Sequence, residues 1–335
     1  MSENYEVVLK RAVQAQPVAA DFEVIGKPVP DPADGQLLVR CVYQSLDPYI
    51  GSRLRNKHMG EAAPQPGSAL PGFSVGEVLR SRHPDIAKGD YVVGECGWTN
   101  FGLMAGNAVR KVDATLPLAA HLGVLGMPGL TAWAGVTQLA QVGPGDIFVV
   151  DAAAGSVGGT AGQIARNLGA RALGIAGGAA KCAQVEGIYG FHACVDYHQA
   201  GWPDRLKELA GAGPTVHFEN VGTSLLLPVL KLLQLYGRVV LCGLAEHYQS
   251  DAPPPEMPVG IIVGKRAKLM GLVVYDYYAR WSEWVELARP WLADGRLVSG
   301  EDIVDGIPAA PDQFERLMRG QNVGKSLVRL GPDRG

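Results

Sequence analysis

The sequence has few cysteines, no long apolar run and almost no excess of charge. Its five cysteines among 335 residues are widely separated and form no Cys-x-x-Cys pair, so neither a disulfide framework nor a cysteine-rich metal site is expected. No apolar stretch approaches the length that crosses a bilayer, and the polar amino terminus does not resemble a signal peptide. A formal net charge of −3 offers no basic face to nucleic acid or anionic lipid. A cytoplasmic protein is therefore expected.

Glycine and apolar strand-like runs are abundant instead. The 44 glycines stand between short runs of apolar residues, which is typical of tight turns in a folded chain rather than of disorder. Residues 36–46, 73–80 and 90–98 are β-rich runs separated by Pro and Gly, as in an irregular and mostly antiparallel β domain. From about Leu118 helical and strand patterns alternate, which predicts a parallel sheet covered on both faces.

The pattern of the first hundred residues returns near the end of the chain, so we expect a split domain. The fold class predicted is α/β, with a mostly β domain made from residues 1–118 and 299–335. A doubly wound parallel-sheet domain at 119–298 is predicted to be inserted between these two parts. The expected strands are 145–153, 170–177, 194–197, 214–222, 237–244, 301–307 and 326–330, and the expected helices are 131–141, 157–169, 283–297 and 311–320.

The segment 151–181 carries the clearest functional pattern. An apolar strand runs through Ala152 into Gly155 and Gly158, where a helix begins. Glycine at this point lets backbone N–H groups approach a pyrophosphate at the helix N-terminus, where the helix dipole favours an anion. The spacing differs from the usual GxGxxG, and glycine at a helix start is often only a packing residue. The strand–turn–helix–strand context nevertheless favours a dinucleotide site.

The acidic residue expected at such a site is missing. An Asp or Glu about 20 residues further on usually binds the ribose 2′-hydroxyl of NAD. Here the second strand ends in Gly177 and Gly178, and the next charged residue is Lys181. A cation attracts the 2′-phosphate that a carboxylate would repel, which favours NADP(H). The competing interpretation is that Lys181 is an ordinary solvated helix residue.

Several segments together resemble one family. They are MPGLTAWAGV, AAAGSVGGTAGQIARNLG, GIAGGAAKC, GFHACVDY, HFENVG, GRVVLCGL and NVGKSLVRL, with SLDPY earlier in the chain. In these segments the chain resembles the zinc-independent medium-chain dehydrogenase/reductases, which include prostaglandin and leukotriene reductases, plant enone reductases and bacterial curcumin reductase-like enzymes. The segment KRAKLMGLVVYDYYARWSEW resembles the bacterial members most. The resemblance implies a GroES-like catalytic domain, an inserted Rossmann domain, NADPH bound between them, and a homodimer.

The same resemblance implies roles for individual residues. The implied cofactor-binding residues are Gly155, Ser156, Val157 and Gly158 at the pyrophosphate, Gly177, Lys181 and Tyr197 at the 2′-phosphate, Asn220, Val221, Cys242 and Gly243 at the strand-end crevice, and Met127, Thr131, Tyr248, Val273, Asn322 and Gly324 elsewhere along the cofactor. Without the resemblance, Tyr197 would be interpreted as a surface tyrosine and Asn322 as a turn asparagine.

No metal site is expected. Where zinc-dependent members of the superfamily carry a GHE motif, this chain has Gly72, Phe73 and Ser74, and none of its seven histidines has a ligand-like spacing to cysteine. Alcohol oxidation without a metal lacks the usual means of lowering the hydroxyl pKa. Reduction of a carbon–carbon double bond conjugated to a carbonyl needs no metal. Hydride is transferred to the β-carbon, a tyrosine hydroxyl or the ribose 2′-hydroxyl of the cofactor donates a hydrogen bond to the enolate oxygen, and a tyrosine or water gives a proton to the α-carbon. The expected substrate is a small hydrophobic enone.

The tyrosine that mammalian and plant members use as the donor to the enolate is missing, because Gly264 stands at its place. The candidate replacements are Tyr248, Tyr49 and Tyr275, in that order, although each is equally consistent with a half-buried packing residue. Arg53 has two interpretations, a pair with an acidic group of the substrate and a surface ion pair, of which the surface pair is favoured. Two other functions remain open: a metal-free NADP-dependent allylic alcohol dehydrogenase, and a non-catalytic NADPH-binding sensor.

Overall fold

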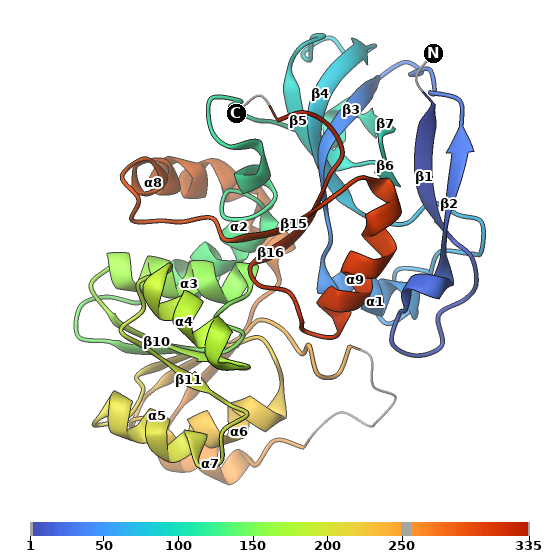
Figure 1. The fold of residues 1–335 in the computed structure, drawn as a ribbon. Helices are drawn as coiled ribbons and strands as arrows, with labels where there is room; N and C mark the ends of the chain where they lie inside the picture. Colours follow the sequence, from blue (N-terminus) through green and yellow to red (C-terminus); the bar gives the residue numbers. More distant parts are fainter. Residues whose placement is uncertain (1–2, 249–255, 334–335) are drawn as a thin grey trace. The chain divides into compact units, whose positions relative to one another are not determined.

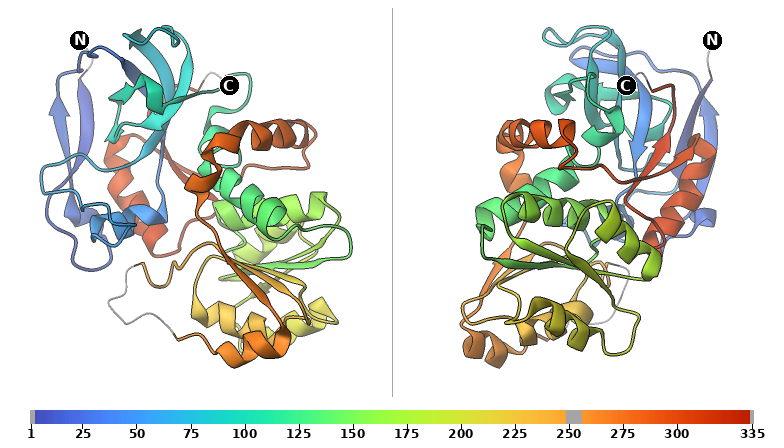
Figure 2. Two further views of the ribbon diagram at one scale, coloured as in Figure 1. Left: turned by 180° about the vertical axis from the view of Figure 1, so that it is seen from behind. Right: turned by 60° about the vertical axis from the view of Figure 1, so that its left-hand side comes forward.

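The structure, a computed structural model, describes residues 3–248 and 256–333 (Figures 1 and 2). The chain divides into two compact units, of which one combines Met1–Leu122 with Glu301–Gly335 and the other is Gly123–Gly300. Within the described residues, no helix is both long enough and apolar enough to cross a membrane. The two units are described separately below.

The unit made from both ends of the chain, here called the split unit, is built mainly from β-strands. Its strands are β1 (Asn4–Leu9), β2 (Phe22–Lys27), β3 (Gln36–Ser45), β4 (Phe73–Ser81), β5 (Tyr91–Glu95), β6 (Trp98–Thr99), β7 (Phe101–Ala105), β8 (Arg110–Lys111), β15 (Glu301–Asp305) and β16 (Lys325–Arg329). The order is β2-β1-β6 in one sheet and β15-β16-β3-β4-β5-β8 in the other, where β7 pairs with β3. All pairs are antiparallel except β15 with β16, which agrees with the predicted mostly antiparallel domain.

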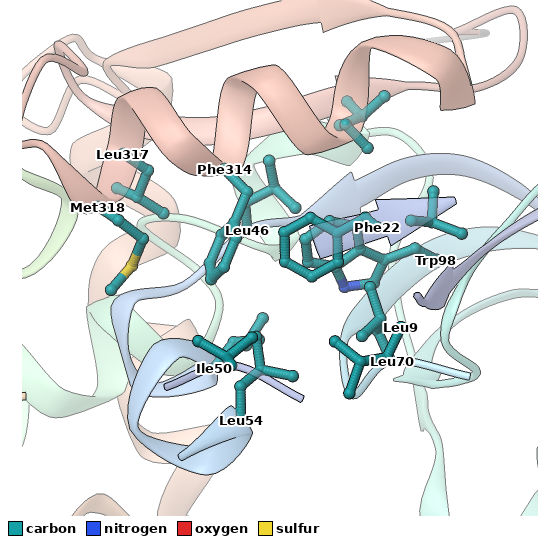
Figure 3. Close-up of a cluster of buried hydrophobic side chains, with 14 of the residues drawn as sticks. Leu9, Phe22, Leu46, Ile50, Leu54, Leu70, Trp98, Phe314, Leu317 and Met318 are labelled. Atoms are coloured by element: carbon teal, nitrogen blue, oxygen red, sulfur yellow. The ribbon is translucent and has the colours of Figure 1, made fainter. Parts of the chain in front are cut away.

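Two α-helices and four 3₁₀ turns complete the split unit: α1 (Pro48–Leu54), α9 (Ala310–Met318), η1 (Ala19–Asp21), η2 (Gly106–Ala108), η3 (Leu118–His121) and η6 (Ile307–Ala309). Helix α9 buries Phe314, Leu317 and Met318, which the three- and four-residue spacing places on one face. Figure 3 shows Phe314 between the helix and the ring of Trp98, whose centroid lies 5.2 Å away. Trp98 is fully buried, so it is a core residue and does not line a pocket.

The inserted unit alternates strands and helices. Its elements are α2 (Met127–Trp133), the π-helical η4 (Ala134–Leu139), β9 (Ile147–Val150), α3 (Ser156–Asn167), β10 (Arg171–Ala176), α4 (Ala179–Gly187), β11 (Ala193–Asp196), α5 (Trp202–Ala210), β12 (Val216–Glu219), α6 (Thr223–Leu232), β13 (Arg238–Leu241), α7 (Val259–Lys265), β14 (Lys268–Gly271), η5 (Val274–Arg280) and α8 (Trp281–Ala293). The predicted strands are all present, whereas β14 was not predicted, and the helix expected at 131–141 begins at Met127 and continues as a π-helix.

The six strands of the inserted unit form one parallel sheet in the order β11-β10-β9-β12-β13-β14. Helices α3 and α4 lie on one face, and α5, α6 and α7 on the other (Figure 1). This is the doubly wound Rossmann arrangement, so the predicted α/β fold class is confirmed. The strand order reverses between β9 and β12, and ligands of such sheets bind beyond the carboxyl ends of the strands at this reversal.

Candidate functional site

The turn between β9 and α3 is built for close backbone approach. A Cβ on Gly158 would lie 2.5 Å from the carbonyl oxygen of Ala152, so only glycine fits where the helix passes the strand end. Gly155 is the N-cap of this twelve-residue helix, and Ala152 has a φ of 46°, in the left-handed region that favours glycine. Helix α3 thus begins at the carboxyl end of β9, where its first N–H groups can bind a phosphate.

The predicted 2′-phosphate residues lie at the carboxyl ends of β10 and β11. A Cβ on Gly177 would lie 3.0 Å from the hydroxyl of Tyr197, so these two residues are in contact range. Lys181 stands in the first turn of α4, which begins just after them. The sequence argument missed Asp196, whose carboxylate accepts hydrogen bonds from the N–H groups of Gly178 (2.8 Å) and His198 (3.0 Å). The hydrogen bond from Gly178 is the main reason that the pKa of Asp196 is lowered.

Asn220, Gly243 and Tyr248 come together at the ends of β12 and β13. A Cβ on Gly243 would lie 2.7 Å from the Asn220 carbonyl oxygen and 3.3 Å from the Tyr248 hydroxyl. The Tyr248 hydroxyl oxygen accepts a hydrogen bond from the Leu244 N–H at 3.3 Å. Burial raises the pKa of Tyr248, which keeps this hydroxyl protonated at neutral pH. The Tyr248 hydroxyl therefore lies at the carboxyl ends of β12 and β13.

The remaining predicted residues of the inserted unit are more dispersed. Met127 begins α2, and its carbonyl accepts a hydrogen bond from the Thr131 hydroxyl at 2.7 Å. Cys242 follows β13 directly, and burial raises its thiol pKa to about 12. Val273 is exposed before η5, as is Tyr275 within it, where the Tyr275 ring packs edge-on against Tyr278.

Tyr49, Asn322 and Gly324 belong to the split unit. The half-buried ring of Tyr49, in α1, lies 5.2 Å from the His58 ring between centroids. The Asn322 side chain donates to the Gly324 carbonyl at 2.8 Å, a local bond typical of a turn asparagine. Arg53 forms ion pairs with Glu61 (2.8 Å) and Glu95 (3.1 Å), which confirms the predicted surface pairing.

A buried ion pair that the sequence argument missed joins the SLDPY and NVGK segments. The Lys325 ammonium donates to the Asp47 carboxylate at 2.9 Å, to the Leu46 carbonyl at 2.6 Å and to the Ser326 carbonyl at 3.3 Å. Both side chains of the pair are more than 90% buried. Asp47 also accepts a short hydrogen bond from the Ser45 hydroxyl. This pair joins the N-terminus of α1, which carries Tyr49, to the start of β16, which follows the turn that contains Asn322.

A second buried polar group, here called the acid–histidine cluster, consists of Asp151, His217 and Glu219. Asp151 follows β9, and the other two lie on the adjacent strand β12, where the two-residue spacing places them on the same face. His217 Nε2 lies 3.2 Å from Asp151 Oδ2 and 3.6 Å from Glu219 Oε2, and all three side chains are fully buried. Across the described part of the chain, this is the one group of three His, Cys, Asp or Glu side chains whose ligand atoms converge.

Comparisons with known proteins place this geometry in a family. Residues 5–112 match a family model described as the N-terminal domain of oxidoreductase, and residues 156–292 match one described as zinc-binding dehydrogenase. The chain is 34% identical to the NADPH-dependent curcumin reductase of Escherichia coli (strain K12), with 98% of each chain covered. It is 33% identical to the 2-alkenal reductase (NADP(+)-dependent) of Nicotiana tabacum, with 98% of this chain and 97% of that one covered. The chain belongs to the zinc-independent medium-chain dehydrogenase/reductases.

A solved structure of a family member shows the same fold. CurA from Vibrio vulnificus, crystallised in complex with NADPH, superposes with a TM-score of 0.91 at 32% identity, covering 98% of this chain and 99% of that one. The family resemblance inferred from the sequence segments is thereby confirmed. The individual site assignments remain predictions, although several of the assigned residues are neighbours within the inserted unit.

Proposed function

We propose that this protein reduces the carbon–carbon double bond of α,β-unsaturated ketones or aldehydes with NADPH. It is an NADPH-dependent oxidoreductase, as its relatives named for curcumin and 2-alkenal reduction are. The observation that carries the proposal lies at the carboxyl ends of β9 and β10. At Gly158, near the start of α3, only glycine fits, and strand β10 does not end in an acidic residue. We further propose that the split unit is the catalytic domain, and that the protein is a cytoplasmic homodimer.

The residues present fit the cofactor. Gly158 lets the start of α3 approach the end of β9 closely, because a Cβ there would lie 2.5 Å from the Ala152 carbonyl oxygen. The first N–H groups of α3 are the groups proposed to bind the pyrophosphate. Lys181 and Tyr197 are the groups proposed to hold the 2′-phosphate, while the nearby Asp196 carboxylate is committed to backbone N–H groups. When bound, NADPH supplies the hydride that reaches the β-carbon of the substrate.

The proposed task of the protein is to stabilise negative charge on the substrate carbonyl oxygen. A protonated tyrosine hydroxyl can donate a hydrogen bond to this oxygen as the charge develops. Tyr248 is the first candidate because its hydroxyl lies next to Gly243 at the end of β13 and because burial raises its pKa. Tyr49 is the second candidate. The same hydroxyl, or water, can then protonate the α-carbon.

The cofactor assignment is tested by Lys181→Ala. The loss of a cation beside a phosphate weakens NADPH binding by about tenfold, whereas NADH affinity changes by less than about twofold. Lys207→Ala, an exposed lysine on α5, is the matched control and leaves both affinities unchanged. Equal losses for NADPH and NADH in Lys181→Ala would remove the phosphate role of this residue.

The reaction is tested with a panel of α,β-unsaturated ketones and aldehydes, with NADPH oxidation as the readout. Tyr248→Phe is expected to lower kcat by about 100-fold while NADPH affinity is retained, since general acids contribute on this scale. Tyr236→Phe, at an exposed position, is the control. If no panel member is reduced although NADPH binds, the protein is a sensor rather than a reductase. Consumption of an allylic alcohol with NADP would indicate a dehydrogenase.

A further inference from the structure

The acid–histidine cluster holds a loop that belongs to the proposed cofactor crevice. Asp151 Oδ1 accepts from the N–H of Asn220 at 2.7 Å, and Glu219 Oε1 accepts from Val221 N–H at 2.7 Å and Gly222 N–H at 2.6 Å. Three successive backbone N–H groups therefore end on two buried carboxyl groups. Asp151 Oδ1 and Glu219 Oε1 thus hold residues 220–222, which lead into α6.

The atoms of Asp151, His217 and Glu219 that face one another have too few hydrogens for each to form a hydrogen bond. Asp151 Oδ2, His217 Nε2 and Glu219 Oε2 all lie within 4.8 Å of one another. Nε2 of an imidazole can carry at most one hydrogen, and it lies closer to Asp151 Oδ2 (3.2 Å) than to Glu219 Oε2 (3.6 Å). Glu219 Oε2 then has no hydrogen-bond donor among the described residues. A buried group of this kind needs one further proton or one cation, because two unpaired carboxylates out of water are strongly unfavourable.

A proton satisfies the cluster better than a metal ion does. A closed zinc site needs four ligands, whereas this cluster supplies three and its side chains are fully buried. A proton needs no additional ligand. Burial, followed by the Asp151 carboxylate, raises the pKa of Glu219 to about 9, whereas burial raises the pKa of Asp151 only to about 6. Glu219 is therefore the carboxyl that keeps a proton at neutral pH.

We propose that Glu219 is protonated at neutral pH and donates to Asp151, so that the acid–histidine cluster acts as a positioning device for residues 220–222. This inference rests on the proposed function, because residues 220–222 are assigned to the cofactor crevice on that basis. The three side chains are fully buried, so their assigned role is to position residues 220–222 rather than to act on the substrate.

Among the described residues, the groups around the cluster supply no positive charge that would offset a second carboxylate. The other titratable groups that face it are the Cys242 thiol, next to β13, and the Glu246 carboxylate in the following loop. Burial and the two carboxyls of the cluster keep Cys242 neutral, and Glu246 adds negative charge. Loss of the Glu219 proton thus adds a second negative charge beside Asp151, directly under a loop proposed to meet an anionic cofactor.

The experiment compares the wild-type full chain with Glu219→Gln and Glu219→Ala by titrating NADPH between pH 7 and 9.5. In Glu219→Gln the amide donates to Asp151 and still accepts from the two N–H groups, so NADPH affinity stays within about twofold of wild type at pH 7 and does not change with pH. Wild-type affinity falls by about tenfold as Glu219 ionises. Glu219→Ala loses about tenfold at every pH because two buried N–H groups lose their acceptor.

Equal losses in Glu219→Gln and Glu219→Ala, or a wild-type affinity that does not change with pH, would overturn the proposal. Glu208→Gln, at an exposed position on α5, is the matched control and keeps the wild-type pH profile. One equivalent of a divalent metal in the purified protein, removable by a chelator with loss of stability, would show a metal site instead. Urea midpoints without NADPH separate this inference from the proposed function. If no variant binds NADPH, a wild-type midpoint that depends on pH and becomes flat in both Glu219→Gln and Glu219→Ala, but not in Glu208→Gln, still supports the proton.

Discussion

The two units each bury charged side chains beneath the loops of the proposed site, but they balance the charge differently. In the split unit, Lys325 and Asp47 form a one-to-one ion pair in which the ammonium makes three hydrogen bonds. In the inserted unit, two carboxyls share a single imidazole and no lysine or arginine faces them among the described contacts. The first group is neutral because the two charges cancel, whereas the second keeps only a single negative charge because Glu219 is proposed to hold a proton. The contribution of the Lys325–Asp47 pair to stability should therefore not change with pH near neutrality, whereas that of the acid–histidine cluster should.

The largest expected effect comes from removing the cation of the neutral pair. Lys325→Met leaves the Asp47 carboxylate buried without a partner, which should lower the free energy of unfolding by about 3–5 kcal/mol. Urea denaturation followed by tryptophan fluorescence measures this change. The double variant Asp47→Asn with Lys325→Met removes both charges and should recover at least half of the loss.

Arg329→Met is the matched control on the same strand. Arg329 pairs with Asp305 at 2.6 Å, but both side chains are about half exposed or more, so this pair contributes less than about 1 kcal/mol. A loss in Lys325→Met as small as that in Arg329→Met would mean that the buried pair is not a significant part of the stability of the split unit.

The second prediction concerns the pH dependence of stability. The pKa of Glu219 is raised from its unfolded value to about 9, so the folded chain binds more protons than the unfolded chain between these values. The free energy of unfolding must therefore fall as pH rises through this window, by about 1.4 kcal/mol per pH unit for one proton. Between pH 7 and 8.5 the wild type should lose about 2 kcal/mol.

The choice of pH range isolates Glu219 from its neighbours. Burial lowers the pKa of His217, and burial raises that of Asp151 to about 6, so both groups have finished titrating by pH 7. Glu219→Gln should remove the slope and leave the split unit unaffected. A slope that persists in Glu219→Gln would assign it to another group and weaken the contrast between the two units.

The smallest expected change in stability comes from relieving backbone strain at one residue in each unit. Ala152 has a φ of 46° beside Asp151, and Met59 has a φ of 43° on an exposed part of the split unit. Replacing either residue by glycine relieves left-handed strain of about 1 kcal/mol, partly offset by the greater entropy of glycine in the unfolded chain. Each variant should gain a few tenths of a kcal/mol at most in thermal or urea unfolding. A loss in Ala152→Gly alone would show that the methyl group of Ala152 packs at the helix start.

Much of the fold followed from local patterns. The apolar run of β9, the glycines of α3 and the regular alternation of strands and helices predicted the Rossmann sheet, because strand and helix periods are visible in a single sequence. Strand β14 was missed because its residues KLMG are short and lie next to a charged segment. The π-helical turn after α2 could not be predicted, since its pattern of apolar residues is that of an α-helix.

The sequence alone determined the class of the fold, the family and the place of the glycine-rich turn that is proposed to bind phosphate, because glycine spacing and strand–helix alternation are local properties of the chain. Only the tertiary structure decided which charged residues are buried together. Lys325 lies 278 residues from Asp47, and His217 lies 66 residues from Asp151, so no local pattern links either pair. The energy of a buried charge depends on the atoms that exclude water from it, and those atoms come from distant parts of the chain.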